Sequence, residues 1–124
     1  MKNLIENQEI AKVVVKSGSK RYEVSTITKD GITPHKLYYS VLIAGIATKI
    51  KLLELVAAAE TKGNEVISAT VILVVESVEV MEKPLVIKRE DSIDVNATIM
   101  TLVEELGGRL LNYIVNTDIF RLIA

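Results

Sequence analysis

The segment from Glu65 to Val80 constrains the fold more than any other part of the sequence. It reads EVISATVILVVESVEV, and most of it consists of β-branched residues, which favour strands. Up to Val75 every second position is apolar, from Ile67 to Val75, whereas after Glu76 the apolar residues Val78 and Val80 lie on the opposite parity. A pattern that changes face predicts a β-bulge or two strands that meet in a bend. Because such a segment would aggregate if exposed, we expect a central strand or an edge covered by a partner subunit.

Turn signals divide the N-terminal half into strands and one helix. Residues 12–16 and 20–28 are β-branched runs on either side of Ser17-Gly18-Ser19, which predicts a hairpin. The run LYYSVLIA, residues 37–44, is predicted to be a buried strand. From Ile46 onward the apolar residues recur at helical spacing, which predicts a helix that ends at Lys62-Gly63-Asn64.

The C-terminal half contains a second predicted helix between two short strands. Lys83-Pro84 interrupts the β-prone segment, and Leu85-Val86-Ile87 resumes it. Ser92 or Asp94 is suited to cap a helix that ends at Gly107-Gly108. Its expected buried face consists of Ile99, Leu102, Val103 and Leu106.

Residues 110–115 are predicted to form a last strand, and Thr117-Asp118 a final helical turn. The resulting order, β-β-β-α-β-β-α-β, predicts an α+β fold with a single mixed sheet and two helices packed on one face. Residues 37–73 and 85–115 share a strand–helix–strand pattern, which we interpret as a common motif of mixed folds rather than as an internal repeat.

Length and composition indicate one domain without covalent or metal stabilisation. The 124 residues fit a single domain, residues 1–124, with residues 1–9 expected to be a flexible tail. The chain lacks cysteine and any uninterrupted apolar stretch of the roughly 20 residues that a membrane-spanning helix needs. We therefore expect a cytoplasmic protein that does not enter a membrane, and a homo-oligomer, because the 65–80 segment needs cover.

Residue patterns that carry catalysis or bind cofactors are not found in the sequence. His35 is the only histidine, and a solvated turn residue is the simpler interpretation than an acid, base or ligand. Glu90, Asp91 and Asp94 form a carboxylate cluster that suits helix capping better than a metal. Ser17-Gly18-Ser19-Lys20 lacks the preceding glycine and the following helix of a phosphate-binding loop. We predict no catalytic residue, no metal and no cofactor.

Basic residues are concentrated in the N-terminal half. Residues 1–62 carry ten Lys and Arg against six Asp and Glu, whereas residues 63–124 carry five against ten. The asymmetry allows head-to-tail association or a local basic face, or it is scattered solvent-facing charge. With tyrosines nearby in sequence, the basic turns suit phosphate contacts and base stacking; the alternative is a solvated hairpin tip. The predicted nucleic-acid-binding residues are Lys16, Lys20, Arg21 and Lys36.

One segment resembles a known family. Gly45-Ile46-Ala47-Thr48, followed by Glu54 within the stretch Leu37–Gly63, is similar to the Alba family of small archaeal chromatin and RNA-binding proteins. The resemblance implies a β-α-β-α-β-β fold, a homodimer, and nucleic-acid binding through basic loops. Val13–Val15 and the basic turn after it match the family's first strand and basic loop.

Two functional hypotheses follow from the sequence. The first is a small non-catalytic nucleic-acid-binding module that uses the basic hairpin turn. The second is a homo-oligomeric protein-interaction or assembly module with no nucleic-acid or catalytic role. It would associate through the exposed β segment, including Val71 and Leu73, or through the charge asymmetry.

Overall fold

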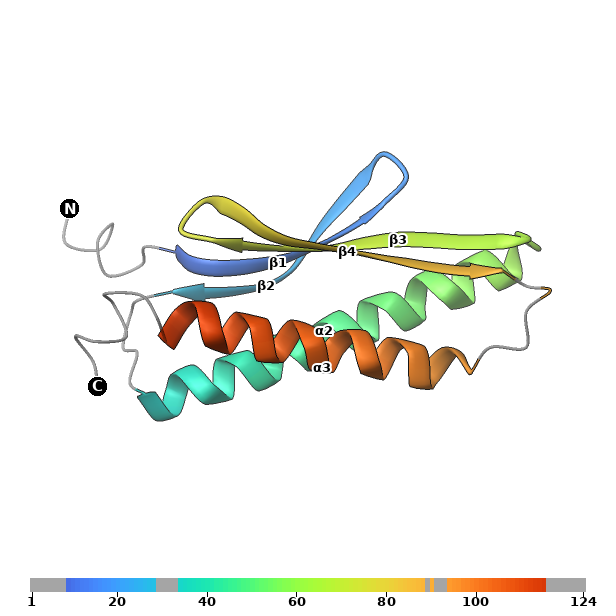
Figure 1. The fold of residues 1–124 in the computed structure, drawn as a ribbon. Coiled ribbons are helices and arrows are strands. Elements are labelled where there is room, and N and C mark those ends of the chain that lie inside the picture. The colour runs from blue at the N-terminus through green and yellow to red at the C-terminus, as the bar shows by residue number, and fades with distance from the viewer. Residues whose placement is uncertain (1–8, 29–33, 89, 91–93, 116–124) are drawn as a thin grey trace.

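The protein is a two-layer sandwich of one sheet and two helices. The computed structural model describes residues 9–28, 34–88, 90 and 94–115. Figure 1 shows both helices lying along the same face of the sheet, which confirms the predicted α+β fold class. Of the predicted tail, residues 1–8 lie outside the described residues, and Glu9 already belongs to a strand. The elements in chain order are β1 (Glu9–Ser17), β2 (Lys20–Thr28), α2 (Pro34–Thr61), β3 (Val66–Val75), β4 (Val78–Lys88) and α3 (Val95–Val115).

The sheet has the strand order β2-β1-β3-β4, and each neighbouring pair is antiparallel, so the single sheet is antiparallel throughout instead of mixed as predicted. The central strands β1 and β3 contain the apolar runs Val13–Val15 and Val71–Val75, and every residue of both runs is buried. Within these runs, the side chains on one face of the sheet pack against the helices. The side chains of Val14, Ile72 and Val74 form a separate small cluster. An uninterrupted apolar run is typical of a strand that is buried on both faces.

The segment 65–80 forms two strands that meet in a turn, which confirms one of the two predicted alternatives. The turn residues Glu76 and Ser77 have φ values of 50° and 68°. Positive φ at both central residues is typical of a type I′ hairpin turn, whose twist matches that of the flanking strands. Because β3 is a central strand, β1 and β4 of the same sheet pair with its two edges. The reason for which we expected an oligomer is therefore removed, although the oligomer itself stays a prediction.

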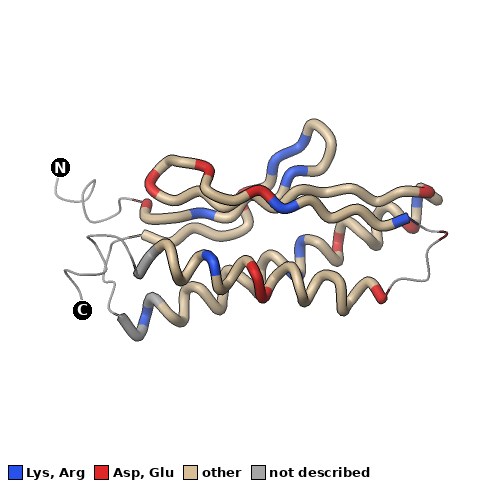
Figure 2. The backbone as a smooth tube through the Cα atoms, in the orientation of Figure 1, with Lys and Arg blue, Asp and Glu red and all other residues tan. Residues whose placement is uncertain are grey.

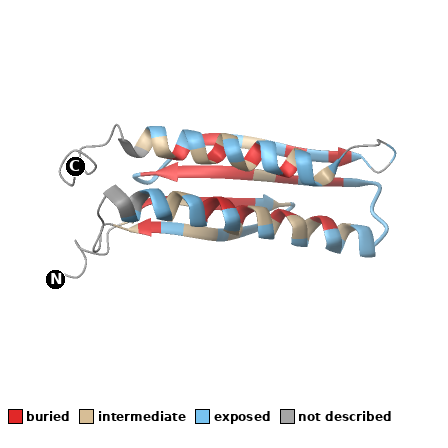
Figure 3. Cartoon of the chain, turned by 90° about the horizontal axis from the view of Figure 1, so that it is seen from below, coloured by how far each residue is buried: buried red, intermediate tan, exposed pale blue. Residues whose placement is uncertain are grey.

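Each helix buries one stripe of its surface on the sheet. On α2 the buried positions recur every fourth residue, and on α3 they recur every third or fourth, as Figure 3 shows by colour. This spacing places them on one side of a helix. They are Ala44, Thr48, Leu52 and Val56 on α2, and Ile99, Leu102, Leu106 and Leu110 on α3.

The predicted strand at residues 37–44 is wrong, because this run is the first part of α2. The apolar residues of the run are distributed all around the helix: Ala44 is buried, whereas Leu42 and Ile43 are more than half exposed. A helix that is apolar on every side lacks the 3.6-residue pattern by which sequence identifies it. The helix predicted from Ile46 onward is confirmed, and α2 begins twelve residues earlier, at Pro34.

The predicted end of the second helix at Gly107-Gly108 and the predicted strand 110–115 are also wrong. Residues 110–115 continue α3, and Leu110 is 1% exposed. The Tyr113 hydroxyl donates a hydrogen bond of 3.2 Å to the Val80 carbonyl of β4. Two mid-helix glycines cost about 2 kcal/mol relative to alanine. Burial of Leu110 and anchoring of Tyr113 offset this cost. The predicted helical turn at Thr117-Asp118 lies outside the described residues.

The predicted interruption at Lys83-Pro84 does not divide the strand, since β4 continues from Val78 to Lys88. Pro84 lies opposite Thr70 of β3. Because β4 is an edge strand, a residue without an N–H group is tolerated where that group would point away from the sheet.

The fold consists of two β-β-α units related by a pseudo-two-fold axis. In the sheet Val14 lies opposite Ile72, and in the helix layer the Gly45 backbone approaches Val103. The two positions of each pair are 58 residues apart, as are the two hairpin turns. The strand–helix–strand pattern that we predicted in residues 37–73 and 85–115 is absent, because residues 37–44 and 110–115 are helical, and the units that resemble each other are β-β-α. The order implied by the Alba resemblance, β-α-β-α-β-β, is not the observed one.

Candidate functional site

The basic residues predicted to bind nucleic acid occupy two separate places. Lys16, Lys20 and Arg21 lie at the tip of the β1–β2 hairpin, which rises on the side of the sheet away from the helices (Figure 2). All three side chains are exposed. Lys36 lies in the first turn of α2, beyond the opposite end of β2, so the fold does not bring it to the hairpin tip.

Carboxylates partly neutralise the sheet surface around this tip. Arg21 Nη2 lies 3.6 Å from Glu79 Oε1 of β4. Lys12 Nζ donates a hydrogen bond of 3.1 Å to Glu23 Oε1 and lies 3.9 Å from Glu9 Oε2. The hydrogen bond to Glu23 and the charge of Glu9 raise the pKa of Lys12. The hairpin is therefore basic at its tip and ion-paired farther along β1.

The tyrosines that we expected beside the basic turns face elsewhere. The ring of Tyr22 lies 4.0 Å from Lys51 Nζ of α2, in a cation–π arrangement. Tyr38 and Tyr39 belong to the first part of α2. No aromatic ring of these three is part of the hairpin tip, so base stacking there would need other side chains.

Asp94 of the carboxylate cluster lies at the start of a helix, and His35 lies within one. Asp94 Oδ1 accepts a hydrogen bond of 3.1 Å from the Ala97 N–H, so Asp94 caps α3 as one of the two predicted candidates. His35 belongs to α2 instead of a turn. Among the described residues no group of three or more Asp, Glu or His is placed to hold a metal ion. Within the same residues, no helix has the length and apolar character needed to span a bilayer.

The outer face of the helix layer is unusually apolar. Five side chains of α2 at spacings of three or four residues are each more than half exposed, together with Tyr38 beside them. Met100 of α3 is 37% exposed. We call this surface the helix-face patch; it comprises Tyr38, Tyr39, Leu42, Ile43, Ile46, Ile50 and Met100. A soluble helix normally places charged and polar residues on the side away from the core.

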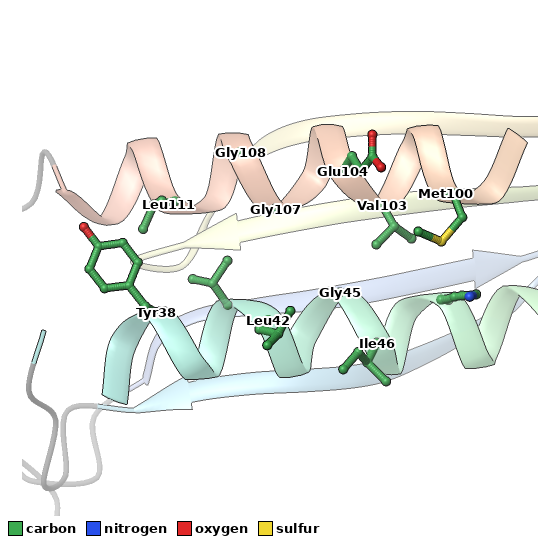
Figure 4. A pocket seen from close by; sticks show the side chains of 12 residues that line it. Tyr38, Leu42, Gly45, Ile46, Met100, Val103, Glu104, Gly107, Gly108 and Leu111 are labelled. Atoms are coloured by element: carbon green, nitrogen blue, oxygen red, sulfur yellow. The ribbon is translucent and has the colours of Figure 1, made fainter. Parts of the chain in front are cut away.

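A groove of about 550 Å³ runs between α2 and α3 within this patch (Figure 4). The two helices run antiparallel along it, so that Tyr38 lies across from Leu111 and Leu42 across from Gly107. Apart from Lys49 and Glu104, the residues that line the groove are apolar, glycine or tyrosine. Neither charged residue takes part in the ion pairs found among the described residues.

Three glycines shape the groove. A Cβ atom at Gly45 would lie 3.2 Å from Val103 Cγ1, so the absence of a side chain there lets the two helices approach. A Cβ atom at Gly107 or Gly108 would meet nothing within 4 Å. The close packing within the chain therefore explains Gly45 but not the other two, which leave an open hollow on α3.

Sequence reasoning missed this surface because it assigned residues 37–44 to a buried strand. A usable signal was present: if the helix of residues 46–62 is extended backwards, Tyr39, Leu42, Ile43 and Ile46 fall on one side. Buried residues such as Ala44 and Thr48 then fall on another side.

Comparison of the chain with family models, curated proteins and solved structures finds no match.

Proposed function

We propose that the chain is a non-catalytic protein-interaction module that binds its partner through the helix-face patch. The observation that carries the proposal is the row of half-exposed Tyr, Leu and Ile side chains on α2 beside an apolar groove. Contiguous apolar surface of this kind is expensive to leave in water and marks a protein-binding site. A binding partner would bury this surface, and the free energy gained by removing it from water would contribute to the affinity.

Conventional catalytic groups do not support an enzyme at this groove. Among the residues that the structure describes, Lys49 and Glu104 are the only charged ones that line it. Thr48 is the one buried polar side chain in the described part of the chain, and its hydroxyl donates a hydrogen bond to the Ala44 carbonyl at 2.7 Å. This hydroxyl is committed to the helix backbone. The chemistry of the surface therefore favours binding through apolar contact.

The proposal is tested by placing a photo-crosslinking amino acid on the patch. We expect the probe at Ile43 to form a discrete protein adduct in cells that contain the chain, because this side chain is 51% exposed on the binding face. The matched control is Val86, which is 52% exposed on the edge strand β4. In addition, Ile46→Lys is expected to abolish the Ile43 adduct. Equal labelling from both positions, or none, contradicts the proposal.

The basic hairpin supports a second candidate function, nucleic-acid binding. The supporting observation is that Lys16, Lys20 and Arg21 share one projecting tip. With three phosphate contacts, the logarithm of the binding constant is expected to fall with the logarithm of the salt concentration, with a slope of about −3 for duplex DNA and about −2 for single strands. Fluorescence anisotropy with duplex DNA, single-stranded DNA and RNA at low and physiological salt measures this slope.

A triple variant, Lys16→Gln, Lys20→Gln and Arg21→Gln, is expected to lose binding to all three nucleic acids. Lys88→Gln, an exposed lysine at the end of β4, is the matched control. Absence of binding at low salt, or equal binding by the triple variant and the wild type, excludes this second function.

A further inference from the structure

We propose that the partner on the helix-face patch is a second copy of this chain, an inference that rests on the proposed function. The two copies pack helix layer against helix layer, through a two-fold axis that runs parallel to the helices. In this arrangement α2 of each copy lies over α3 of the other, and the two sheets lie on the outside. The area of the patch, the shapes of the two helices and the charges of the groove support a second copy as the partner.

The area of the patch matches half of a stable protein–protein interface. A large side chain presents about 150–250 Å² when fully exposed, so six half-exposed side chains present on the order of 600 Å² of apolar surface. This is at the upper limit of about 300–600 Å² for the largest patch of a typical monomer. With the groove floor added, it approaches the roughly 800 Å² that each partner contributes to a standard interface.

The two helices offer complementary shapes to a second copy. The α2 side of the patch projects Leu42 and Ile46, whereas the α3 side has the open hollow at Gly107 and Gly108. Leu42 lies directly across the groove from Gly107 (Figure 4). Rotation about an axis parallel to the helices therefore places Leu42 of one copy on the glycine hollow of the other. The same contact occurs twice, as an isologous interface requires.

The charges of the groove are self-complementary in the same arrangement. Lys49 is on α2 and Glu104 is on α3, and neither has an ion-pair partner among the described residues. When α2 lies over α3 of the other copy, Lys49 of each copy comes within side-chain reach of Glu104 of the other. A two-fold pair therefore has two compensating charge contacts at the edge of its apolar centre.

The occupant is tested by the mass of the full chain in solution, measured by sedimentation across protein concentrations from micromolar upward. We expect a dimer. Gly108→Leu should remain folded by circular dichroism, because a Cβ atom there meets nothing in the chain, yet raise the dimer dissociation constant at least tenfold by filling the hollow. Lys88→Leu, at an exposed position at the end of the edge strand β4, should leave the constant unchanged.

The charge contact is tested by reversal. Lys49→Glu and Glu104→Lys should each raise the dissociation constant several-fold, and the double variant should return it to within about threefold of the wild type. Lys88→Glu serves as the control away from the groove. A wild-type chain that stays monomeric at 100 μM, about a hundred times the lowest concentration, overturns the second copy as occupant. So does a dimer that is indifferent to Gly108→Leu and to both charge reversals.

Failure of this inference is distinguishable from failure of the proposed function. A monomeric chain whose Ile43 probe crosslinks to a different protein contradicts the dimer and leaves the binding role of the patch intact. A monomeric chain that gives no Ile43-specific adduct contradicts both.

Discussion

Val71 and Leu73 lie in the centre of β3, and both are 0% exposed. Their side chains point from the sheet into the core shared with both helices. The hypothesis that oligomers form through an exposed β segment placed these two residues on the association surface. Since they are core residues, a lysine at either position would bury a charge and unfold the chain instead of dissociating an oligomer.

At this scale we predict the effect of removing two methyl groups from the core. Val71→Ala is expected to lower the free energy of unfolding by about 2–3 kcal/mol, through lost apolar burial and a residual cavity. Val86→Ala, the same change at a position that is 52% exposed, should change it by less than about 0.5 kcal/mol. Urea unfolding followed by circular dichroism measures both values. Equal losses would show that β3 is not the central strand.

At the scale of elements, α2 and α3 differ in how sequence identifies them. The N-terminus of α3 follows from a local signal, because Asp94 accepts the hydrogen bond of the Ala97 N–H. The beginning of α2 does not, because apolar residues lie on its buried side at Ala44 and on its exposed side at Leu42 and Ile43 alike. The end of α3 was misjudged for a related reason: Gly107-Gly108 is a strong local stop signal that contacts made by Leu110 and Tyr113 outweigh.

The cap of α3 supplies the prediction at this scale. Asp94→Ala is expected to lower the stability of the chain by about 1 kcal/mol, because the Ala97 N–H loses its acceptor at the helix end. This corresponds to a decrease of about 4 °C in the midpoint of thermal unfolding. Asp94→Asn retains an acceptor oxygen and is the control. A midpoint unchanged by Asp94→Ala would show that solvent replaces the cap without cost.

At the scale of the whole molecule, two similar β-β-α units have diverged in charge. The hairpin of the first unit has Lys16, Lys20 and Arg21 at its tip, whereas the hairpin of the second unit has Glu76 and Glu79 (Figure 2). Arg21 and Glu79, which occupy equivalent positions in the two units, form an ion pair. The unequal charges of the two halves of the sequence thus belong to two units of one fold.

The helix layer has diverged as well. Ile50 of α2 is equivalent to Gly108 of α3, so one unit projects an apolar side chain where the other leaves a hollow. This difference gives the outer face a projecting side and a receiving side. A perfectly symmetric pair of helices would have offered two ridges to a second copy and no place to receive them.

Local signals in the sequence determined a large part of the fold. They include the β1–β2 hairpin, the turn that divides residues 65–80, the cap at Asp94 and the helix from Ile46 onward. Each depends on residues a few positions apart, because turns, caps and side-chain periodicity are short-range properties of the backbone. The joint position of Lys16, Lys20 and Arg21 followed from the hairpin, whereas the separation of Lys36 from them did not.

The tertiary structure alone decided which apolar residues are covered. Residues 37–44 have the composition of a buried strand, and only packing on the sheet makes them a helix with one face in the core and another in solvent. Packing also allows α3 to continue past Gly107 and Gly108, because the burial of side chains farther along the helix outweighs the cost of two glycines in a helix. Burial depends on contacts between residues far apart in the chain. For this reason the helix-face patch, on which the proposed function rests, becomes visible only in the folded molecule.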